Sequence, residues 1–353
     1  MRQINFNNKI ILVTGVAGFI GASLTKQLLT DFKNIKIIGI DNMNDYYDIR
    51  LKNSRLAELL VNKCFIFMKG NLADKTFINS IFQKYRPSIV VNLAAQAGVR
   101  YSIINPDAYI ESNLIGFFNI LESCRHYPVE HLVYASSSSV YGSNTKIPYS
   151  TKDKVDHPVS LYAATKKSNE LMAHVYSKLY DIPSTGLRFF TVYGPAGRPD
   201  MAYFDFTNKL LKKETIQLFN YGNCKRDFTY IDDIVEGIIC VMQKAPEKCN
   251  DDTDTSTSSY AIYNIGNNTP EKLLDFVEIL QEELINAGLL PNDYNFELYK
   301  KLVPMQPGDV ITTYADTSEL EHDFNFKPNT SLREGLRKFV KWYKEFYENI
   351  DEP

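Results

Sequence analysis

Tyr162 and Lys166 are the two side chains whose types and spacing best suit proton chemistry. The four-residue separation places a phenol and an ammonium on one face of the helix predicted to continue through Glu170. The ammonium favours the phenolate electrostatically, so it lowers the pKa of the tyrosine toward the working pH, as a general base requires. Such pairs are also common on surface helices, so the interpretation depends on the motifs that accompany this one.

A run of hydroxyl side chains lies upstream of this pair. Ser136, Ser137, Ser138 and Ser139 follow an apolar segment that predicts a buried strand. Ligands of open α/β sheets bind at the carboxyl edge of the strands, where these serines would lie. A serine run by itself is most often a loop or a cap. In company with the Tyr-Lys pair, it predicts a catalytic site at that edge.

A glycine loop follows the first apolar run of the chain. Gly15, Gly18 and Gly21 would form a tight turn and open a helix near Phe19 or Ile20. The turn lets the backbone approach a pyrophosphate, and the helix N-terminus presents free N–H groups to the anion. The spacing differs by one step from Gly-x-Gly-x-x-Gly, and a tight packing turn is the alternative interpretation.

An acidic residue at the end of the second apolar run strengthens this interpretation. Asp41 stands twenty residues beyond Gly21, where a carboxylate accepts hydrogen bonds from a ribose 2′- and 3′-hydroxyl. A carboxylate at this place repels a 2′-phosphate, which favours NAD over NADP. The order of strand, loop, helix, strand and acid therefore predicts NAD as the cofactor.

The elements that position these motifs alternate along the first half of the chain. Short β-branched runs at 10–13, 35–40, 64–67, 89–91 and 132–134 are separated by segments of helical length. Buried parallel strands joined by crossover helices follow, so the predicted fold class is α/β, with a Rossmann-type doubly wound parallel sheet and a smaller C-terminal α/β substrate domain.

The domain boundary is expected where the alternation becomes irregular, after residue 188. We predict an NAD-binding Rossmann domain over 1–190 and a mainly substrate-binding domain over 191–353, from which segments can return to the first domain. The polar stretch 247–259 predicts a loop. Apolar residues at helical spacing from Leu332 to Phe346 predict a helix that faces the core.

Composition excludes several function classes. The formal net charge of -3 and the pI near 6.0 disfavour a nucleic-acid partner, which calls for a concentrated basic surface. The five cysteines lack paired spacing and the five histidines lack ligand spacing, so neither disulfides nor a metal site are expected. The first apolar run is too short for a signal segment, and no membrane segment follows. A reduced, cytoplasmic protein is the expectation.

Together, these motifs resemble the extended short-chain dehydrogenase/reductase family, the nucleotide-sugar epimerases and dehydratases. The resemblance covers nearly the whole chain. Its most specific stretches are closer to UDP-glucuronate 4-epimerases than to UDP-galactose 4-epimerases, and they span 41–47, 95–102, 188–195 and 197–202.

The resemblance implies 4-epimerisation of a UDP-sugar, with conversion of UDP-glucuronate to UDP-galacturonate as the preferred assignment. Tyr162 would take the proton of the sugar 4-hydroxyl with help from Ser137, while Lys166 would hold the nicotinamide ribose. Hydride would pass from the sugar C4 to NAD and return to the other face after the 4-keto sugar turns in the pocket. The resemblance also implies a role in polysaccharide biosynthesis and a homodimer formed through the helices that carry Asn113 and Tyr162.

Positions that match the family's cofactor site share its loop backbones and strand ends. They are Gly15, Gly18, Phe19, Ile20, Gly21, Asp41, Asn42, Asn44, Asn71, Leu72, Leu93, Ala94, Ala95, Ala97, Asn113, Ser136, Tyr162 and Lys166. One of them departs from the pattern, because many relatives have an aspartate where this chain has Asn71. An Asn carbonyl still accepts a hydrogen bond from the adenine amine, so the NAD affinity can shift while the site persists.

Positions implied for the substrate carry hydroxyl or charged side chains. They are Arg100, Ser137, Ser138, Ser139, Thr191, Arg198, Arg226 and Asp309. A guanidinium fork suits carboxylates and phosphates, which favours the arginines. Arg226 could instead form a surface ion pair with Asp227 or Asp232, and the other two arginines could equally be solvated.

Four alternative functions are compatible with these motifs to different degrees. A 4,6-dehydratase is disfavoured, because Ser138 and Ser139 stand where that relative has an acid pair. A UDP-glucuronate decarboxylase or a 4-epimerase of UDP-glucose or UDP-N-acetylglucosamine stays open. A catalytically silent NAD-sensing protein belongs to a different class, and the intact Tyr162-Lys166 pair argues against it.

Overall fold

The computed structural model describes residues 1–248, 258–305 and 311–351. Its main feature is a seven-stranded parallel sheet in the order β12-β7-β6-β5-β2-β3-β4. The strands are β2 (Ile10–Thr14), β3 (Lys36–Asp41), β4 (Phe65–Lys69), β5 (Ile89–Asn92), β6 (His131–Ser137), β7 (Ser184–Phe189) and β12 (Tyr260–Ile265). The strand order reverses between β2 and β5, so a crevice for a ligand is expected there, outside the carboxyl ends of the strands.

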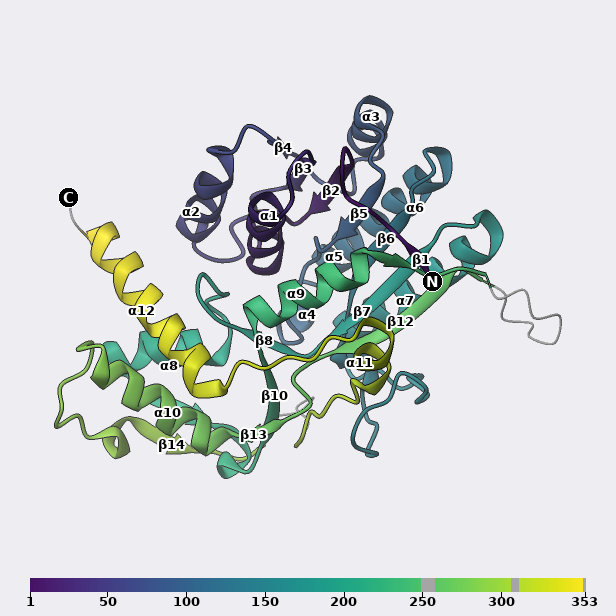
Figure 1. Cartoon of the computed structure of the whole chain (residues 1–353). Helices are drawn as coiled ribbons and strands as arrows, with labels where there is room; N and C mark the ends of the chain where they lie inside the picture. Colours follow the sequence, from purple (N-terminus) through teal and green to yellow (C-terminus); the bar gives the residue numbers. More distant parts are fainter. Residues whose placement is uncertain (249–257, 306–310, 352–353) are drawn as a thin grey trace.

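Helices cover both faces of this sheet (Figure 1). They are α1 (Phe19–Asp31), α2 (Ile49–Leu60) and α9 (Ile231–Met242) on one side, and α3 (Lys75–Tyr85), α6 (Gly116–His126) and α7 (Leu161–Tyr180) on the other. Successive residues of β2 supply both interfaces. Ile11 and Val13 belong to the core with α1 and α9, whereas Leu12 belongs to the core with α3 and α6. Alternating strand residues point to opposite faces, so a strand buried on both faces must be apolar throughout.

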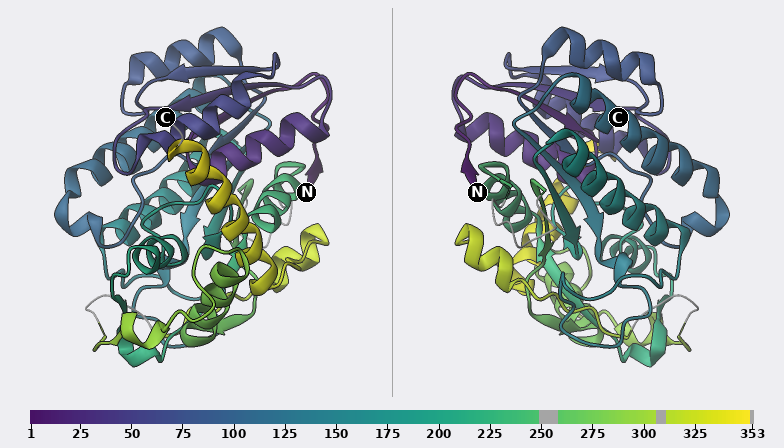
Figure 2. Two further views of the ribbon diagram at one scale, coloured as in Figure 1. Left: turned by 90° about the vertical axis from the view of Figure 1, so that its left-hand side faces the viewer. Right: turned by 90° about the vertical axis from the view of Figure 1, so that its right-hand side faces the viewer.

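The C-terminal half builds a smaller mixed layer beside the sheet (Figures 1 and 2). In its three-stranded sheet, β10 (Lys225–Tyr230) lies between β13 (Pro270–Lys272) and β8 (Thr191–Tyr193). A two-stranded sheet pairs β14 (Lys300–Leu302) with β9 (Ile216–Leu218). Its helices are α8 (Ala202–Leu211), α10 (Leu273–Asn286) and α12 (Leu332–Asp351), whereas α11 (Ser318–Phe324) packs against β12 at the edge of the main sheet. Phe204 and Phe339 contact at a ring separation of 5.6 Å and join α8 to α12.

Short elements complete the chain. Strands β1 (Arg2–Gln3) and β11 (Lys244–Ala245) pair antiparallel. The short helices are α4 (Tyr101–Ile104), α5 (Pro106–Tyr109), η1 (Ile110–Ile115), η2 (Ser138–Tyr141), η3 (Phe219–Gly222) and η4 (Phe296–Tyr299). Of these, η1 is a π-helix and η2 follows directly on β6.

The predicted fold class is confirmed, as are the five strands and the helix that begins at Leu332. Strand β12 and helix α9 come from the C-terminal half but belong to the main sheet and its covering layer. The domain boundary itself stays a prediction. The polar loop predicted over 247–259 falls mostly outside the described residues.

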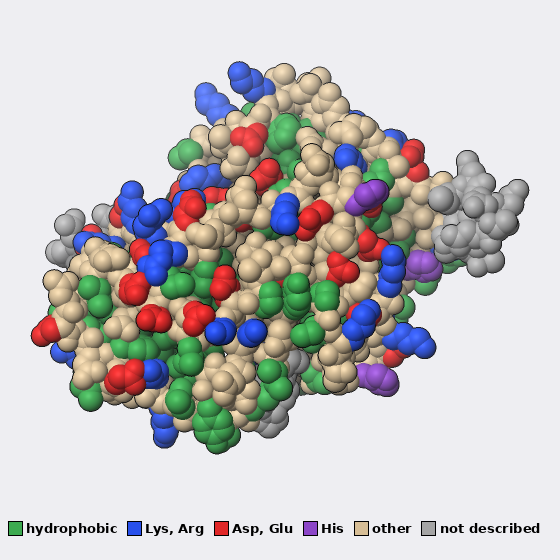
Figure 3. Space-filling view, turned by 60° about the horizontal axis from the view of Figure 1, so that its bottom comes forward, with side chains coloured by type: hydrophobic (Ala, Val, Ile, Leu, Met, Phe, Trp, Pro, Cys, Tyr) green, Lys and Arg blue, Asp and Glu red, His purple; other side chains and the backbone are tan. Residues whose placement is uncertain are grey.

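Two surface properties bear on partners. Over the described segments, no helix is both long and apolar enough to cross a bilayer. On the face shown in Figure 3, lysine and arginine side chains are interspersed with aspartate and glutamate, and neither sign dominates.

Candidate active site

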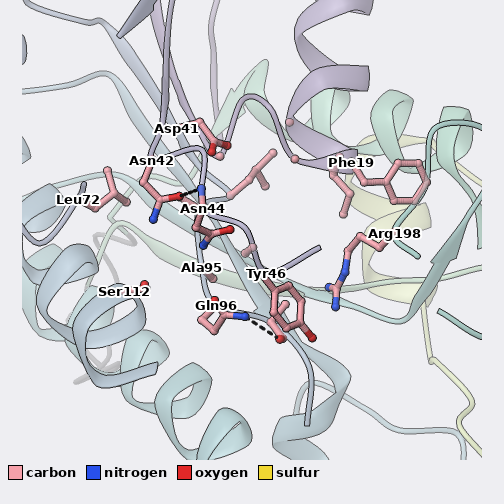
Figure 4. Close-up of a pocket in the computed structure, with 18 of the residues that line it drawn as sticks. Phe19, Asp41, Asn42, Asn44, Tyr46, Leu72, Ala95, Gln96, Ser112 and Arg198 are labelled. Atoms are coloured by element: carbon pink, nitrogen blue, oxygen red, sulfur yellow. Dashed lines mark hydrogen bonds between the residues drawn. The ribbon is translucent and has the colours of Figure 1, made fainter. Parts of the chain in front are cut away.

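A pocket lies at the carboxyl edge of the sheet, where the strand order reverses. It brings together most of the residues predicted from sequence. Those that line it are Gly15, Gly18, Phe19, Ile20, Gly21, Asp41, Asn42, Asn44, Asn71, Leu72, Leu93, Ala94, Ala95, Ala97, Ser136, Ser137, Tyr162, Lys166 and Arg198. Figure 4 shows part of this lining, with Asp41 and Asn42 at one end and Arg198 extending toward Tyr46 at the other.

The glycine loop leaves its end of the pocket open to an anion. Gly15 has φ +71°, and a Cβ atom there would lie 2.8 Å from the backbone nitrogen of Ala94. A Cβ atom at Gly21 would lie 2.2 Å from the Gly15 carbonyl oxygen, so the helix could not approach the loop this closely. Helix α1 begins at Phe19, and no side chain caps its N-terminus. Its first N–H groups therefore suit the pyrophosphate of a dinucleotide.

Asp41 ends β3 with its carboxylate at the pocket. The side chain is 8% exposed, and its oxygens accept hydrogen bonds from the backbone N–H groups of Ala17 at 3.1 Å and Met43 at 2.8 Å. A carboxylate has about four acceptor positions, so two further donors can bind, as a ribose with two hydroxyls requires. The Asp41 carboxylate thus holds the glycine loop through Ala17 and keeps free acceptor positions at the pocket, and its predicted role in binding a ribose stays a prediction.

Lys52 stands beside this carboxylate and was missed by the sequence analysis. Its Nζ lies 4.0 Å from Asp41 and donates to the backbone and side-chain oxygens of Asn44 at 2.8 and 2.6 Å. Burial lowers the pKa of Lys52, and the charge of Asp41 opposes that shift. Lys52 lines the pocket, but from sequence it is one of many lysines on a predicted helix.

The Tyr-Lys pair lies on the first turns of α7, whose N-cap Ser160 accepts a hydrogen bond from the Ala163 N–H. Lys166 is 3% exposed and its Nζ donates to the Ala135 carbonyl at 2.8 Å. Burial lowers the pKa of Lys166 to about 8. Both side chains line the same pocket, as the four-residue spacing predicts.

Ser137 joins the end of β6 to this pair. Burial raises the pKa of Tyr162, while a hydrogen bond with Ser137 and the positive charge of Arg198 act in the opposite direction. The Ser137 hydroxyl also accepts hydrogen bonds from the Ser139 N–H at 3.2 Å and the Ser139 hydroxyl at 2.9 Å. A phenol with a hydrogen-bonded hydroxyl and nearby cations is suited to exchange a proton with an alcohol.

Several predicted residues do not line the pocket. Ser138 and Ser139 lie in η2, one and two residues after Ser137, and Thr191 begins β8 between two lining residues. The Arg100 guanidinium lies 5.1 Å from the ring centroid of Phe219. None of these residues lines the pocket, and their roles stay predictions.

Arg226 does not line the pocket, and its guanidinium binds backbone carbonyls. Arg226 donates to the carbonyls of Lys225 at 2.9 Å and Ile311 at 3.1 Å. No ion pair with the acids considered from sequence is found among the described residues. Asp309 lies outside the described residues.

Asn113 supports the pocket wall instead of lining it. The side chain is 2% exposed; it accepts from the Gln96 N–H at 2.8 Å and donates to the Gln96 carbonyl and the Thr165 hydroxyl, both at 3.0 Å.

Asn71 lines the pocket, its amide donating to Glu111 at 2.8 Å and its carbonyl accepting from Ala73 at 3.0 Å. A carbonyl has a second lone pair, so the predicted acceptor role is compatible with these contacts.

Other lining residues were not singled out from sequence. Tyr46 and Gln96 lie within motifs quoted for the family resemblance, which is the only signal that could have found them. Tyr46 donates to Asp200 at 3.3 Å, and Asp200 also accepts two hydrogen bonds from Arg198, at 3.0 and 2.6 Å. The described part of the chain holds no group of three acidic, histidine or cysteine side chains that could bind a metal ion.

Comparisons with known proteins agree with this geometry. Residues 11–266 match the model of the NAD dependent epimerase/dehydratase family. The chain is 50% identical to Protein CapI of Staphylococcus aureus over 96% of this chain and 99% of that one. It is 44% identical to UDP-glucuronate 4-epimerase 4 of Arabidopsis thaliana, over 98% and 78% of the two chains. The structure superimposes on UDP-glucuronic acid 4-epimerase from Bacillus cereus, solved with UDP-glucuronic acid and NAD, with a TM-score of 0.83, 31% identity, and coverage of 96% and 100%.

Proposed function

Because this chain belongs to the NAD dependent epimerase/dehydratase family, we propose that it interconverts UDP-glucuronate and UDP-galacturonate by epimerisation at the sugar C4. The observation that carries the proposal is the convergence of Ser137, Tyr162 and Lys166 on the pocket that the glycine loop also lines. Side chains suited to deprotonate a hydroxyl and a dinucleotide site therefore share one cavity. NAD is the cofactor, and when bound it accepts and returns the C4 hydride.

The protein's own side chains would carry out the proton transfers. The Tyr162 phenolate takes the proton of the sugar 4-hydroxyl and later returns it, with the Ser137 hydroxyl as its hydrogen-bond partner. Lys166 lines the same pocket as Tyr162, and its Nζ donates to the Ala135 carbonyl. We assign its positive charge to favouring the ionised form of the phenol. No net oxidation results, because the hydride removed from C4 is returned to C4 and the proton taken by Tyr162 is given back.

The proposed preference for a uronic acid rests on the hydroxyl groups near the tyrosine. Ser137 and Ser139 are linked by a 2.9 Å hydrogen bond at the start of η2, and Ser138 lies between them. We assign the substrate carboxylate to these hydroxyls and to Thr191. Hydroxyls and N–H groups hold a carboxylate still, which opposes loss of carbon dioxide from the 4-keto sugar. Relatives named as UDP-glucuronate 4-epimerases support this assignment.

The decisive experiment incubates the purified protein separately with UDP-glucuronate, UDP-glucose and UDP-N-acetylglucosamine. The anomeric signals are followed by NMR and NADH by absorbance. We expect UDP-glucuronate to reach equilibrium with its galacto epimer without net NADH, and Tyr162→Phe to abolish the conversion. Release of carbon dioxide and a UDP-pentose would establish the decarboxylase instead. Turnover of the neutral sugars alone would establish another 4-epimerase, and NAD binding without any turnover would favour the sensing protein.

We also propose a homodimer built on α7 and the neighbouring η1–α6 segment. Leu171, Val175 and Leu179 recur at helical spacing on α7 and are 56%, 48% and 64% exposed. Ile115 and Phe118, beside them, are 46% and 41% exposed. An apolar stripe on two adjacent helices is costly in water and suits the same stripe of a second copy. A cytoplasmic location and a role in polysaccharide biosynthesis complete the proposal.

A further inference from the structure

Arg55 is a buried arginine that touches two loops of the active site without lining the pocket. It lies on α2 and is 5% exposed. Its Nη1 donates to the Ala17 carbonyl at 3.0 Å and to the Tyr47 hydroxyl at 2.7 Å. Its Nε and Nη2 donate to the carbonyls of Ala196 at 2.9 Å and Gly197 at 2.8 Å. One guanidinium therefore bridges segments that are far apart in the sequence.

The first of these segments is the glycine loop. Ala17 lies between Gly15 and Gly18, and its N–H donates to Asp41, the proposed ribose-binding acid. Its carbonyl is held by Arg55. The N–H and the carbonyl of Ala17 are therefore both held by hydrogen bonds. A pyrophosphate that binds the glycine loop would contact the same backbone that Arg55 holds.

The second segment carries the proposed substrate arginine. Ala196 adopts the left-handed region at φ +54°. A Cβ atom at Gly197 would lie 1.7 Å from the Tyr203 hydroxyl oxygen, so this turn is tightly confined. Arg198 follows at once, lines the pocket and pairs with Asp200. The two carbonyls that Arg55 holds therefore set the backbone from which Arg198 departs.

Among the described residues, the guanidinium of Arg55 donates hydrogen bonds only to neutral groups. No carboxylate of the described residues lies within ion-pair distance of it, and its four acceptors are three carbonyls and a phenol. Burial of a guanidinium costs desolvation free energy unless its N–H groups are hydrogen-bonded. If this position served only to fill space, an apolar residue of similar size would stabilise the fold at least as well. Five donors in a rigid fork, by contrast, can hold several carbonyls from two loops in fixed relation.

We propose that Arg55 is a positioning residue that couples the NAD loop to the loop of Arg198, so that the bound cofactor prepares the site for the sugar nucleotide. The inference rests on the proposed function in taking Arg198 as a substrate contact. Coupling between two sites is reciprocal and falls between about 5- and 150-fold in typical proteins. It must vanish when the bridge between them is removed.

The test measures UDP-glucuronate binding by calorimetry in the Tyr162→Phe background, where turnover is blocked, with and without NAD. We expect binding to be about tenfold tighter with NAD. Arg55→Lys keeps the charge but not the fork, and Arg55→Met keeps neither. Both should reduce the ratio toward one. Arg50→Met, an exposed position on the same helix paired with Asp48, should leave it unchanged. An unaltered ratio in folded Arg55→Lys protein would overturn the proposal.

A second readout separates this inference from the proposed substrate. Hydrogen exchange of residues 194–201 is compared before and after NAD addition, with no sugar present. Protection of this segment in the wild type and its loss in Arg55→Lys would support the coupling, even if UDP-glucuronate proved not to be the ligand. Equal NAD-induced protection in both proteins would refute the coupling while leaving the epimerase assignment intact.

Discussion

The Nε atom of Arg188 lies 2.8 Å from Oε1 of Glu170, and both side chains are only 3% exposed. A second contact of 2.9 Å joins Nη2 to the other carboxylate oxygen, so the pair is bidentate. Glu170 also accepts from the Ser136 hydroxyl at 2.7 Å, and Arg188 donates to the Tyr141 hydroxyl at 3.1 Å. This buried ion pair therefore holds helix α7, which carries the proposed catalytic residues, against β7 and the end of β6, one residue from Ser137.

Removal of one partner should destabilise the protein strongly. Glu170→Ala leaves the Arg188 charge buried without its carboxylate, and we expect the free energy of unfolding to fall by about 3–5 kcal/mol. Urea unfolding measures the change. The matched control is Glu58→Ala, because Glu58 forms an exposed pair with Lys26 at 2.6 Å and should change stability by less than about 1 kcal/mol. Similar changes in the two variants would show that the buried pair has no special weight.

His131 predicts how stability depends on acidity. Its ring is fully buried, contacts the Thr185 hydroxyl at 2.8 Å, and burial lowers its pKa to about 4 from the ordinary 6.5. Between these values the unfolded chain binds more protons than the folded one, so stability falls as the pH drops below about 6.5. The expected contribution is about 2 kcal/mol at pH 5 relative to pH 7.5.

The measurement is urea unfolding of wild type and His131→Gln at these two pH values. The loss between them should be smaller in the variant by about that amount. His126→Gln, at a largely exposed position on α6, should retain the wild-type loss. If both variants lose as much as the wild type, His131 does not carry the acid sensitivity.

Local patterns explain why much of this fold and site could be predicted. The strands β2, β3 and β5 can be recognised as apolar runs because both of their faces are buried. In α7, the four-residue spacing places Tyr162 and Lys166 on one face of the helix. Parallel strands bring their carboxyl ends to one edge, so the motifs that follow them must meet there.

The remaining contacts are not local. Arg55 donates to backbone carbonyls 141 and 142 residues away. Every residue has a backbone carbonyl, so the sequence cannot indicate which ones a distant side chain will contact. Lys52 and Glu170 acquire their partners through the packing of α2 and α7 on other elements. The return of β12 to the main sheet likewise depends on tertiary packing, since its sequence suits an edge strand of either half.

Lys166 should govern the acid limb of the pH profile, where activity rises with pH. The proposed base is the Tyr162 phenolate, so kcat/KM should rise with pH as the phenol ionises. Lys166→Met removes a neighbouring cation; this raises the pKa of the tyrosine and moves the rise to higher pH. At pH 7.5 the variant should lose about 10²–10⁴-fold in kcat. Lys178→Met, at the exposed end of the same helix, should keep the wild-type profile. A profile unshifted by Lys166→Met would assign the lysine to ribose binding alone.

Asp41 should control both affinity for NAD and discrimination against NADP. Asp41→Ser removes the carboxylate but leaves a hydroxyl, so each lost ribose contact should cost about 1.5–3 kcal/mol of NAD binding. The repulsion of a 2′-phosphate disappears as well, and the ratio of NAD to NADP affinity should fall. Fluorescence titration with the reduced cofactors measures both. Asp45→Ser changes an exposed acid of the same segment and should preserve the ratio; a preserved ratio in Asp41→Ser would contradict the assigned role.

The apolar stripe on α7 should hold two copies together. Val175 lies between Leu171 and Leu179 on the exposed face, so a charge at this position would be buried without a partner in a symmetric contact. We expect Val175→Arg to sediment as a monomer at micromolar concentration, where the wild type sediments as a dimer. Val159→Arg, which changes a residue 47% exposed just before α7, is the matched control and should remain dimeric. A monomeric wild type, or a dimeric Val175→Arg, would place the contact between copies elsewhere or exclude it.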